Sequence, residues 1–233
     1  MQRFKSMKKL LKPVLVLSIA AMLTLAFAGC AQLDVVAKDS VTSFDALLNV
    51  APDKVQADEM NGGWSITAPD ASSRFIWSED YSKSPLHDVM IEFDAQPFID
   101  AGLDVAKLPD TVTYYENKLM VGTKLGTDEL KYTGEATPLA SFEQIVKLYR
   151  SSIGYHTALD HYGVALANGN MFEWAKDMSA NDKDMVFVLN PEPFINAGVD
   201  PNAIAGWKFA KVTVDVNGKP TEVDKILKPF DLK

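Results

Sequence analysis

The feature that most constrains the fold of this chain is an internal duplication. Eight residues from Pro97 to Asp104 recur from Pro193 to Asp200, with six positions identical and two replaced conservatively. Further matches occur in the same order on both sides: Ser43-Phe44 with Ser141-Phe142, Phe75 and Trp77 with Phe172 and Trp174, and Val112-Thr113 with Val212-Thr213. The offset between matched residues drifts between 96 and 100, which is typical of a tandem repeat that has gained and lost loop residues. The sequence therefore predicts two copies of one module.

Each copy begins with an amphipathic helix. Apolar residues recur at helical spacing from Phe142 to Ile153, and Ser141 and Gln144 have the spacing of a capping box. Gly154 is placed to end this helix. The first copy carries a shorter version of the same face, which ends before Pro52. We expect the two helices to begin close to Ser43 and Ser141.

Segments with a period of two follow each helix. The aligned apolar residues are Trp64, Ile66 and Ala68 with Tyr162, Val164 and Leu166, and Val89, Ile91 and Phe93 with Met185, Phe187 and Leu189. This alternation predicts strands with one face on a core. The repeated motif then supplies prolines for the start of a short helix and a glycine for its end. Asn117 and Asn217-Gly218 indicate hairpin turns.

Few connections in this order are long enough for a parallel crossover. We therefore predict an α+β fold of two tandem homologous modules, residues 41–138 and 139–233. Each module is expected to be a mainly antiparallel sheet with helices packed on it.

The N-terminal residues have the pattern of a secretory signal. Five basic residues and no acidic residue precede Cys30, and an apolar stretch runs from Val14 to Phe27. This stretch is short for a membrane span and has the flanks of a cleavable signal. The run Phe27-Ala28-Gly29-Cys30 resembles the lipobox of bacterial lipoproteins, although Phe27 stands where that family usually has leucine.

This resemblance implies that residues 1–29 are a signal peptide and that Cys30 is lipidated and becomes the first mature residue. Residues 30–40 are then a tether. The protein is expected to be extracytoplasmic and lipid-anchored to the cell membrane, or to the outer membrane in a diderm source, because residue 31 is not Asp. At about 0.8 kcal/mol per buried methylene, two or more acyl chains are enough for stable anchoring. An ordinary signal peptide with a chance cysteine and an uncleaved anchor are the alternatives.

Removal of residues 1–29 would leave a strongly acidic chain. The whole sequence has 23 Lys and Arg against 31 Asp and Glu, and the predicted signal contains five of the basic residues, so the mature net charge is −13. Such a charge disfavours nucleic acid and favours cationic or neutral envelope ligands or protein partners. Cys30 is the sole cysteine, so no disulfide is expected.

Two groups of residues are candidate ligand sites. His156, Asp160 and His161 cluster in the second copy, and residues four apart share a helix face, but Asp58 and Gly63 occupy the matching places in the first copy. We expect a copy-specific role there and no metal site. Trp77 and Trp174 share a face with their neighbouring phenylalanines, which favours core anchoring over an exposed platform for a sugar or peptide.

No catalytic signature occurs in the sequence. It contains no nucleophile elbow, no metalloprotease motif and no phosphate-binding glycine loop. We assign no catalytic residue and no cofactor. The sequence favours a binding or interaction lipoprotein with its site at the junction of the two copies. An envelope hydrolase acting on cell-wall or peptide material is the alternative.

Overall fold

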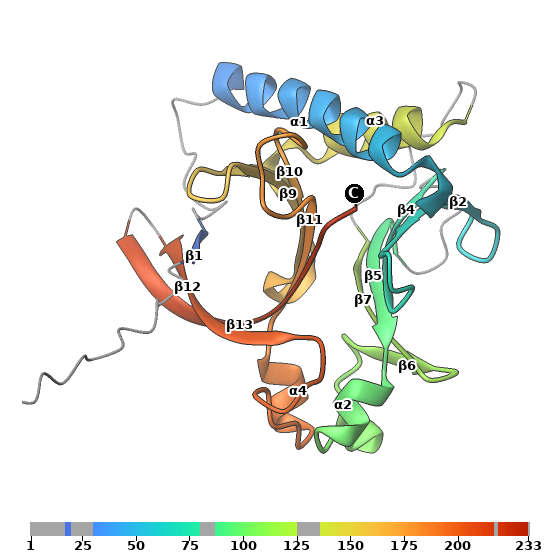
Figure 1. Cartoon of the computed structure of the whole chain (residues 1–233), viewed down its shortest axis with the longest axis vertical. Helices are drawn as coiled ribbons and strands as arrows, with labels where there is room; N and C mark the ends of the chain where they lie inside the picture. Colours follow the sequence, from blue (N-terminus) through green and yellow to red (C-terminus); the bar gives the residue numbers. More distant parts are fainter. Residues whose placement is uncertain (1–16, 20–29, 80–86, 125–135, 217–218, 233) are drawn as a thin grey trace, which may run out of the picture.

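The computed structural model describes residues 17–19, 30–79, 87–124, 136–216 and 219–232. The chain forms two similar modules, each with a sheet and helices packed against it, which confirms the predicted α+β fold. The two sheets face each other, with the long helices α1 and α3 across one end and the short helices α2 and α4 at the other (Figure 1).

Module 1 contains a six-stranded antiparallel sheet in the order β2-β3-β4-β5-β7-β6. Its elements are α1 (Cys30–Val50), η1 (Pro52–Lys54), β2 (Val55–Asp58), β3 (Gly63–Thr67), β4 (Ser73–Ser78), β5 (Val89–Asp94), α2 (Gln96–Asp100), η2 (Val105–Lys107), β6 (Thr113–Tyr115) and β7 (Lys118–Thr123).

Module 2 repeats this order in its antiparallel strands, β8-β9-β10-β11-β13-β12. Its elements are α3 (Pro138–Leu148), η3 (Arg150–Ser152), β8 (Ile153–His156), β9 (His161–Ala165), η4 (Ala167–Gly169), β10 (Met171–Ala175), β11 (Met185–Leu189), α4 (Glu192–Asn196), β12 (Lys208–Val216) and β13 (Lys219–Phe230). A further strand, β1 (Leu17–Ile19), pairs in parallel with β12 at the edge of the sheet.

Strand register supports the predicted alignment of the copies in the first four strands. Trp77 pairs with Trp64 and Val89, and Trp174 pairs with Tyr162 and Met185. The alignment of the hairpins was wrong. Met120 and Leu227 occupy equivalent places in the two sheets, because they pair with equivalent residues of β5 and β11. On the other side, Met120 pairs with Thr113, whereas Leu227 pairs with Lys208. Lys208, and not Thr213, is therefore the counterpart of Thr113, because the β12–β13 hairpin is longer than β6–β7.

The predicted helix ends also need correction. Helix α3 begins at Pro138, where the Thr137 hydroxyl accepts a hydrogen bond from the Ala140 amide at 3.1 Å. Ser141 is thus inside the helix. The helix ends at Leu148, before a short 3-10 turn, and Gly154 lies in β8. The Asn217-Gly218 turn and most of the predicted signal peptide lie outside the described residues.

Residues 31–40 are helical and do not form the predicted tether. They belong to α1, and Ala37 and Ser40 are buried. This part of α1 packs on module 2: burial and the nearby Asp39 carboxylate raise the pKa of Tyr162 on β9 to about 12. The apolar face of α1 extends further toward the N-terminus than the sequence pattern indicated, and the sheet of module 2 supplies its partner.

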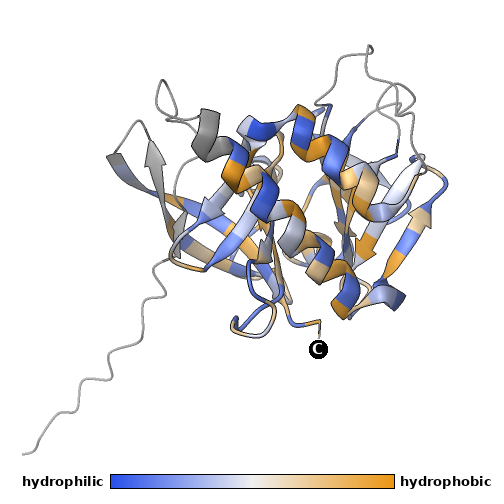
Figure 2. Ribbon diagram, turned by 90° about the horizontal axis from the view of Figure 1, so that it is seen from above, coloured by the Kyte–Doolittle hydropathy of each residue, from blue (hydrophilic) through white to orange (hydrophobic). Residues whose placement is uncertain are grey.

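The modules share one core, and the repeated aromatic residues meet at its centre. Phe44 stacks on Phe142 with ring centroids 3.6 Å apart, and Phe75 stacks on Phe172 at 4.2 Å. Seen from above, hydrophobic and hydrophilic residues alternate along α1 and α3, as expected for helices with one buried face (Figure 2). The duplicated residues therefore hold the two copies together.

Hydrogen bonds cross between the modules in reciprocal pairs. The indole of Trp77 donates to Ser141 Oγ at 2.9 Å, and that of Trp174 donates to Ser43 Oγ at 2.7 Å. At the opposite end, Gly102 and Gly198 have φ angles of +107° and +101°, and a Cβ on Gly102 would lie 2.7 Å from the Gly198 carbonyl oxygen. Glycine is thus required by both conformation and close approach.

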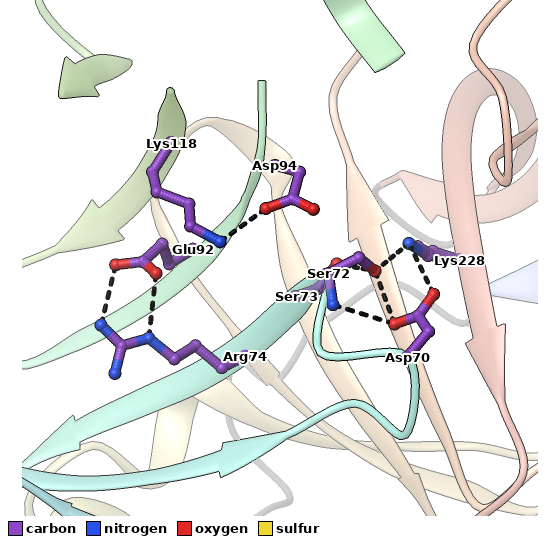
Figure 3. A network of polar contacts seen from close by, with 8 residues as sticks. All are labelled: Asp70, Ser72, Ser73, Arg74, Glu92, Asp94, Lys118 and Lys228. Carbon is purple, nitrogen blue, oxygen red and sulfur yellow. Dashed lines mark hydrogen bonds and ion pairs between the residues drawn. The ribbon is translucent and has the colours of Figure 1, made fainter. Parts of the chain in front are cut away.

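One ionic contact between the modules has no counterpart. Lys228 on β13 reaches the β3–β4 turn, where its ammonium lies 3.2 Å from Asp70 and also contacts Ser72 (Figure 3). The same view shows Arg74 paired with Glu92 through two hydrogen bonds of 3.0 and 2.9 Å. Val121 occupies the place of Lys228 in module 1, as the register shows.

Candidate functional site

The junction of the modules, where we expected a site, contains two open grooves between α1 and α3. The larger has a volume of about 430 Å³ and the smaller about 320 Å³. The larger is lined by Asp34, Ala37, Lys38, Val41 and Thr42 from α1 and by Glu143, Val146, Lys147 and Arg150 from α3 and η3. The smaller is lined by Asp45, Leu48, Asn49, Pro52, Val55, Thr137, Pro138 and Leu139. Both modules contribute to each groove.

The larger groove lies beside the first turns of α1 and carries charges of both signs. Arg150 forms an ion pair with Asp34 across it, and Lys38, Glu143 and Lys147 complete the charged lining. The smaller groove is lined by one ionisable side chain, Asp45. The two grooves thus occupy corresponding places beside the paired helices but offer different chemistry.

Trp77 and Trp174 form no ligand platform. Both are fully buried, and both indole N–H groups donate to serines of the other module. The structure places them in the core, which is the role that the sequence favoured.

His156 and His161 do come together, but on a hairpin and not on a helix face. They end β8 and begin β9, and they pair directly with each other. On the neighbouring strand β10, Glu173 points to the same face of the sheet, because it pairs with Gly163, two residues after His161. The face is the one turned away from the shared core, since Phe172 and Trp174 take the other side.

The three side chains form a buried cluster. Glu173 is 0% exposed, His161 3% and His156 5%. Oε2 of Glu173 lies 3.6 Å from Nδ1 of His156 and 3.8 Å from Nδ1 of His161. Burial by itself raises the pKa of Glu173, but the two facing imidazoles outweigh it and hold the pKa below its ordinary value. The cluster thus favours an ionised carboxylate.

The backbone beneath Glu173 makes room for its side chain. A Cβ on Gly163 would lie 3.2 Å from Cγ of Glu173, so a larger residue at this point of β9 would press on the acid. Gly154 of β8 pairs with Gly163. Two glycines therefore stand beside the histidines on the face that carries the cluster.

Asp160 stands apart from this cluster. It lies in the turn between β8 and β9 with a φ of +54°, and it accepts a hydrogen bond from the Tyr155 hydroxyl. That hydrogen bond raises the pKa of Tyr155. The predicted trio of His156, Asp160 and His161 is therefore wrong in its third member, and Glu173 takes that place.

Sequence reasoning missed Glu173, although one signal pointed to it. If Phe172 and Trp174 share the core face, Glu173 must lie on the opposite face. Its burial and its alignment with two histidines depend on the pairing of β9 with β10, which periodicity does not reveal.

In the part of the chain that the structure describes, no group of three or more His, Cys, Asp or Glu side chains is arranged to hold a metal ion. No helix among the described residues is both long and apolar enough to span a membrane. Comparisons with protein-family models, curated proteins and solved structures gave no match.

Proposed function

We propose that this chain is an extracytoplasmic lipoprotein, anchored through an acylated Cys30, that binds a neutral or cationic envelope component without catalysing a reaction. The observation that carries the proposal is that Cys30, the cysteine of the lipobox-like run, lies in α1, and that this helix continues from there without a break into the shared core. An acyl anchor at this residue would join a rigid helix and no flexible tether.

The position of the larger groove supports this proposal. At a rise of about 1.5 Å per residue, Asp34 and Lys38 lie roughly 6 and 12 Å along α1 from Cys30. The groove between α1 and α3 would therefore face the region next to the lipid headgroups. Its mixed charges suit a ligand that is neutral overall and carries charges of both signs, such as a zwitterionic headgroup or a mixed-charge peptide segment.

Burial of the histidine cluster argues against the hydrolase alternative. Glu173 and the two imidazoles are enclosed, so a wall polymer has no access to them in this conformation. A binding role needs no such access, because the α1–α3 grooves are open.

Mass spectrometry of the membrane fraction tests the anchor. We expect a mature chain that begins at a diacylated or triacylated Cys30, and a Cys30→Ser variant that is not acylated and not cut before residue 30. Processing would also remove β1, but β1 is a three-residue parallel edge strand, so the six antiparallel strands of its sheet keep their pairing. An intact Met1 on the wild-type chain would refute the anchor.

A pair of groove-filling variants tests the binding site. Thr42→Trp would fill the larger groove and Asn49→Trp the smaller one. Both residues are exposed on α1, so the fold should tolerate both changes. We expect Thr42→Trp to reduce binding to vesicles of zwitterionic lipid or to purified envelope fractions at least tenfold, and Asn49→Trp to leave it unchanged. Equal binding by all three proteins would exclude the larger groove, and hydrolysis of wall or peptide substrates by the wild type would overturn the non-catalytic role.

A further inference from the structure

The cluster of His156, Glu173 and His161 is unusual because its polar atoms are buried and unpaired. Both carboxylate oxygens of Glu173, both ring nitrogens of His156 and Nδ1 of His161 have no hydrogen-bond partner among the described residues. Buried polar groups in native proteins are nearly always paired. The arrangement therefore calls for a positive charge that compensates the carboxylate.

A hydrogen bond from Nε2 of His161 indicates that an imidazole of the cluster carries this positive charge. Nε2 of His161 lies 3.2 Å from the backbone carbonyl oxygen of Lys183. A carbonyl oxygen only accepts, so Nε2 carries a hydrogen. Nδ1 then faces Oε2 of Glu173 with either a lone pair or a second proton. A lone pair would repel the carboxylate at 3.8 Å, whereas a proton would attract it.

We infer that His156, Glu173 and His161 form a proton-binding site, in which one imidazolium compensates the buried Glu173 carboxylate and fastens the β8–β9 hairpin to β10. A proton is favoured over a metal ion because these side chains do not converge as metal ligands do. This inference does not depend on the lipid anchor or on the groove.

Charged groups on the surrounding elements have other partners or, like Lys183, an exposed side chain. At the hairpin end, Asp160 accepts from Tyr155, and Lys176 lies over the Tyr155 ring at 5.1 Å. On β13, Lys225 donates to the Gly169 carbonyl at 2.7 Å. Asp184, which precedes β11, accepts from the Leu232 amide at 2.7 Å. Lys183 contributes its backbone carbonyl to His161. The compensating proton is therefore held by the two imidazoles themselves.

Loss of the proton has a structural consequence. It leaves a buried, uncompensated carboxylate, which strongly disfavours the closed state. β8 is an edge strand, so the hairpin can separate without breaking the rest of the sheet. Leu159 of the hairpin packs on an apolar cluster of Val186, Val188, Val212 and Leu227, so opening would uncover part of this cluster. The site thus makes exposure of one apolar face depend on pH.

Hydrogen exchange measured by mass spectrometry tests the inference on the full-length chain in detergent between pH 5.5 and 9. After correction for intrinsic exchange, we expect opening of the hairpin at 153–165 to increase with pH, by up to about tenfold per pH unit over the range in which opening releases the proton. The equivalent hairpin at 55–67 in the same molecule is the internal control and should show no such rise. A Glu173→Gln variant should abolish the pH dependence, and an Asp58→Asn variant, changed at the place that matches His156, should retain it.

Measurements on the wild type keep the test valid if Glu173→Gln fails to fold. Nuclear magnetic resonance should show that one of the two imidazoles is protonated while the hairpin is closed. The inference is refuted if the exchange of 153–165 does not depend on pH, or if both imidazoles are neutral in the closed state. Stabilisation of the hairpin by zinc, reversed by a chelator, would replace the proton with a metal ion and would also overturn the inference.

Discussion

The two modules agree on the faces that meet and differ on the faces turned outward. On the inner faces, the repeated phenylalanines stack on their counterparts in the other module. Each repeated tryptophan donates a hydrogen bond to a repeated serine of the other module. On the outer face of module 1, Asp58, Arg74 and Glu92 form an ion-paired group, with Arg74 3.0 Å from Asp58. On the outer face of module 2, His156 takes the place of Asp58, Met171 that of Arg74, and Glu173 that of Ile76. Duplication preserved the interface and left the outer faces to diverge.

The largest loss of stability should come from changes to the two phenylalanines that stack on each other between the modules. Because Phe44 and Phe142 are fully buried and stack on each other, either change to Ala should lower the free energy of unfolding by about 3–5 kcal/mol. Denaturant titration measures both losses. Losses that differ by more than about 1.5 kcal/mol would break the proposed equivalence of the two faces.

The close approach of the two glycines gives the next test. Gly102→Ala and Gly198→Ala each place a Cβ less than 3 Å from the carbonyl of the other glycine, at 2.7 and 2.9 Å, with a positive φ. Conformational strain alone should cost about 1–3 kcal/mol in either variant. Thermal unfolding should show similar decreases for both, and a tolerated change in one copy alone would show that this contact is not symmetric in solution.

Changing Arg74 to Met would give module 1 the residue that module 2 has at the same place. The change leaves the buried Asp58 carboxylate without its ion pair and removes two hydrogen bonds to Glu92. We expect a loss of about 1–3 kcal/mol. Asp58→Asn in the same background should recover part of it, because the unpaired charge is then gone. No loss in urea titration of Arg74→Met would mean that solvent already compensates Asp58.

The smallest effect concerns the contact between Lys228 of module 2 and Asp70 of module 1. Partial burial raises the pKa of Asp70, but hydrogen bonds from Ser72 and the Lys228 ammonium outweigh it and hold the pKa below 3.8. A group whose pKa is lower in the folded state stabilises the fold above its unfolded pKa, and this contribution is lost as the pH falls through the folded pKa.

Asp70 is about half exposed, so Asp70→Asn should lower stability at neutral pH by less than about 1 kcal/mol. The difference from the wild type should shrink in high salt and disappear as the pH falls through the lowered pKa of Asp70 in the folded state. A difference that persists at acid pH would assign the effect to packing and not to charge.

The sequence predicts some of these similarities and differences between the two modules. The repeat matches Trp77 with Trp174. The alternation of residues along β10 predicts that Phe172 and Trp174 share one face. The first copy has Asp58 and Gly63 at the matching places, which identified His156 and His161 as specific to module 2. Proximity in the sequence predicts Asp160 as their partner, but the hairpin turn directs its carboxylate toward Tyr155.

The sequence by itself determined that the chain holds two copies of an α+β module, which residues alternate toward a core, and where the short helices of the repeated motif lie. These are local properties, set by periodicity, proline and glycine positions, and repetition. The tertiary structure alone decided that the repeated residues bind the copies to each other, that residues 31–40 extend α1, and that Glu173 is enclosed between two histidines. Each of these depends on contacts between segments far apart in the sequence, and strand register and packing partners have no local signature.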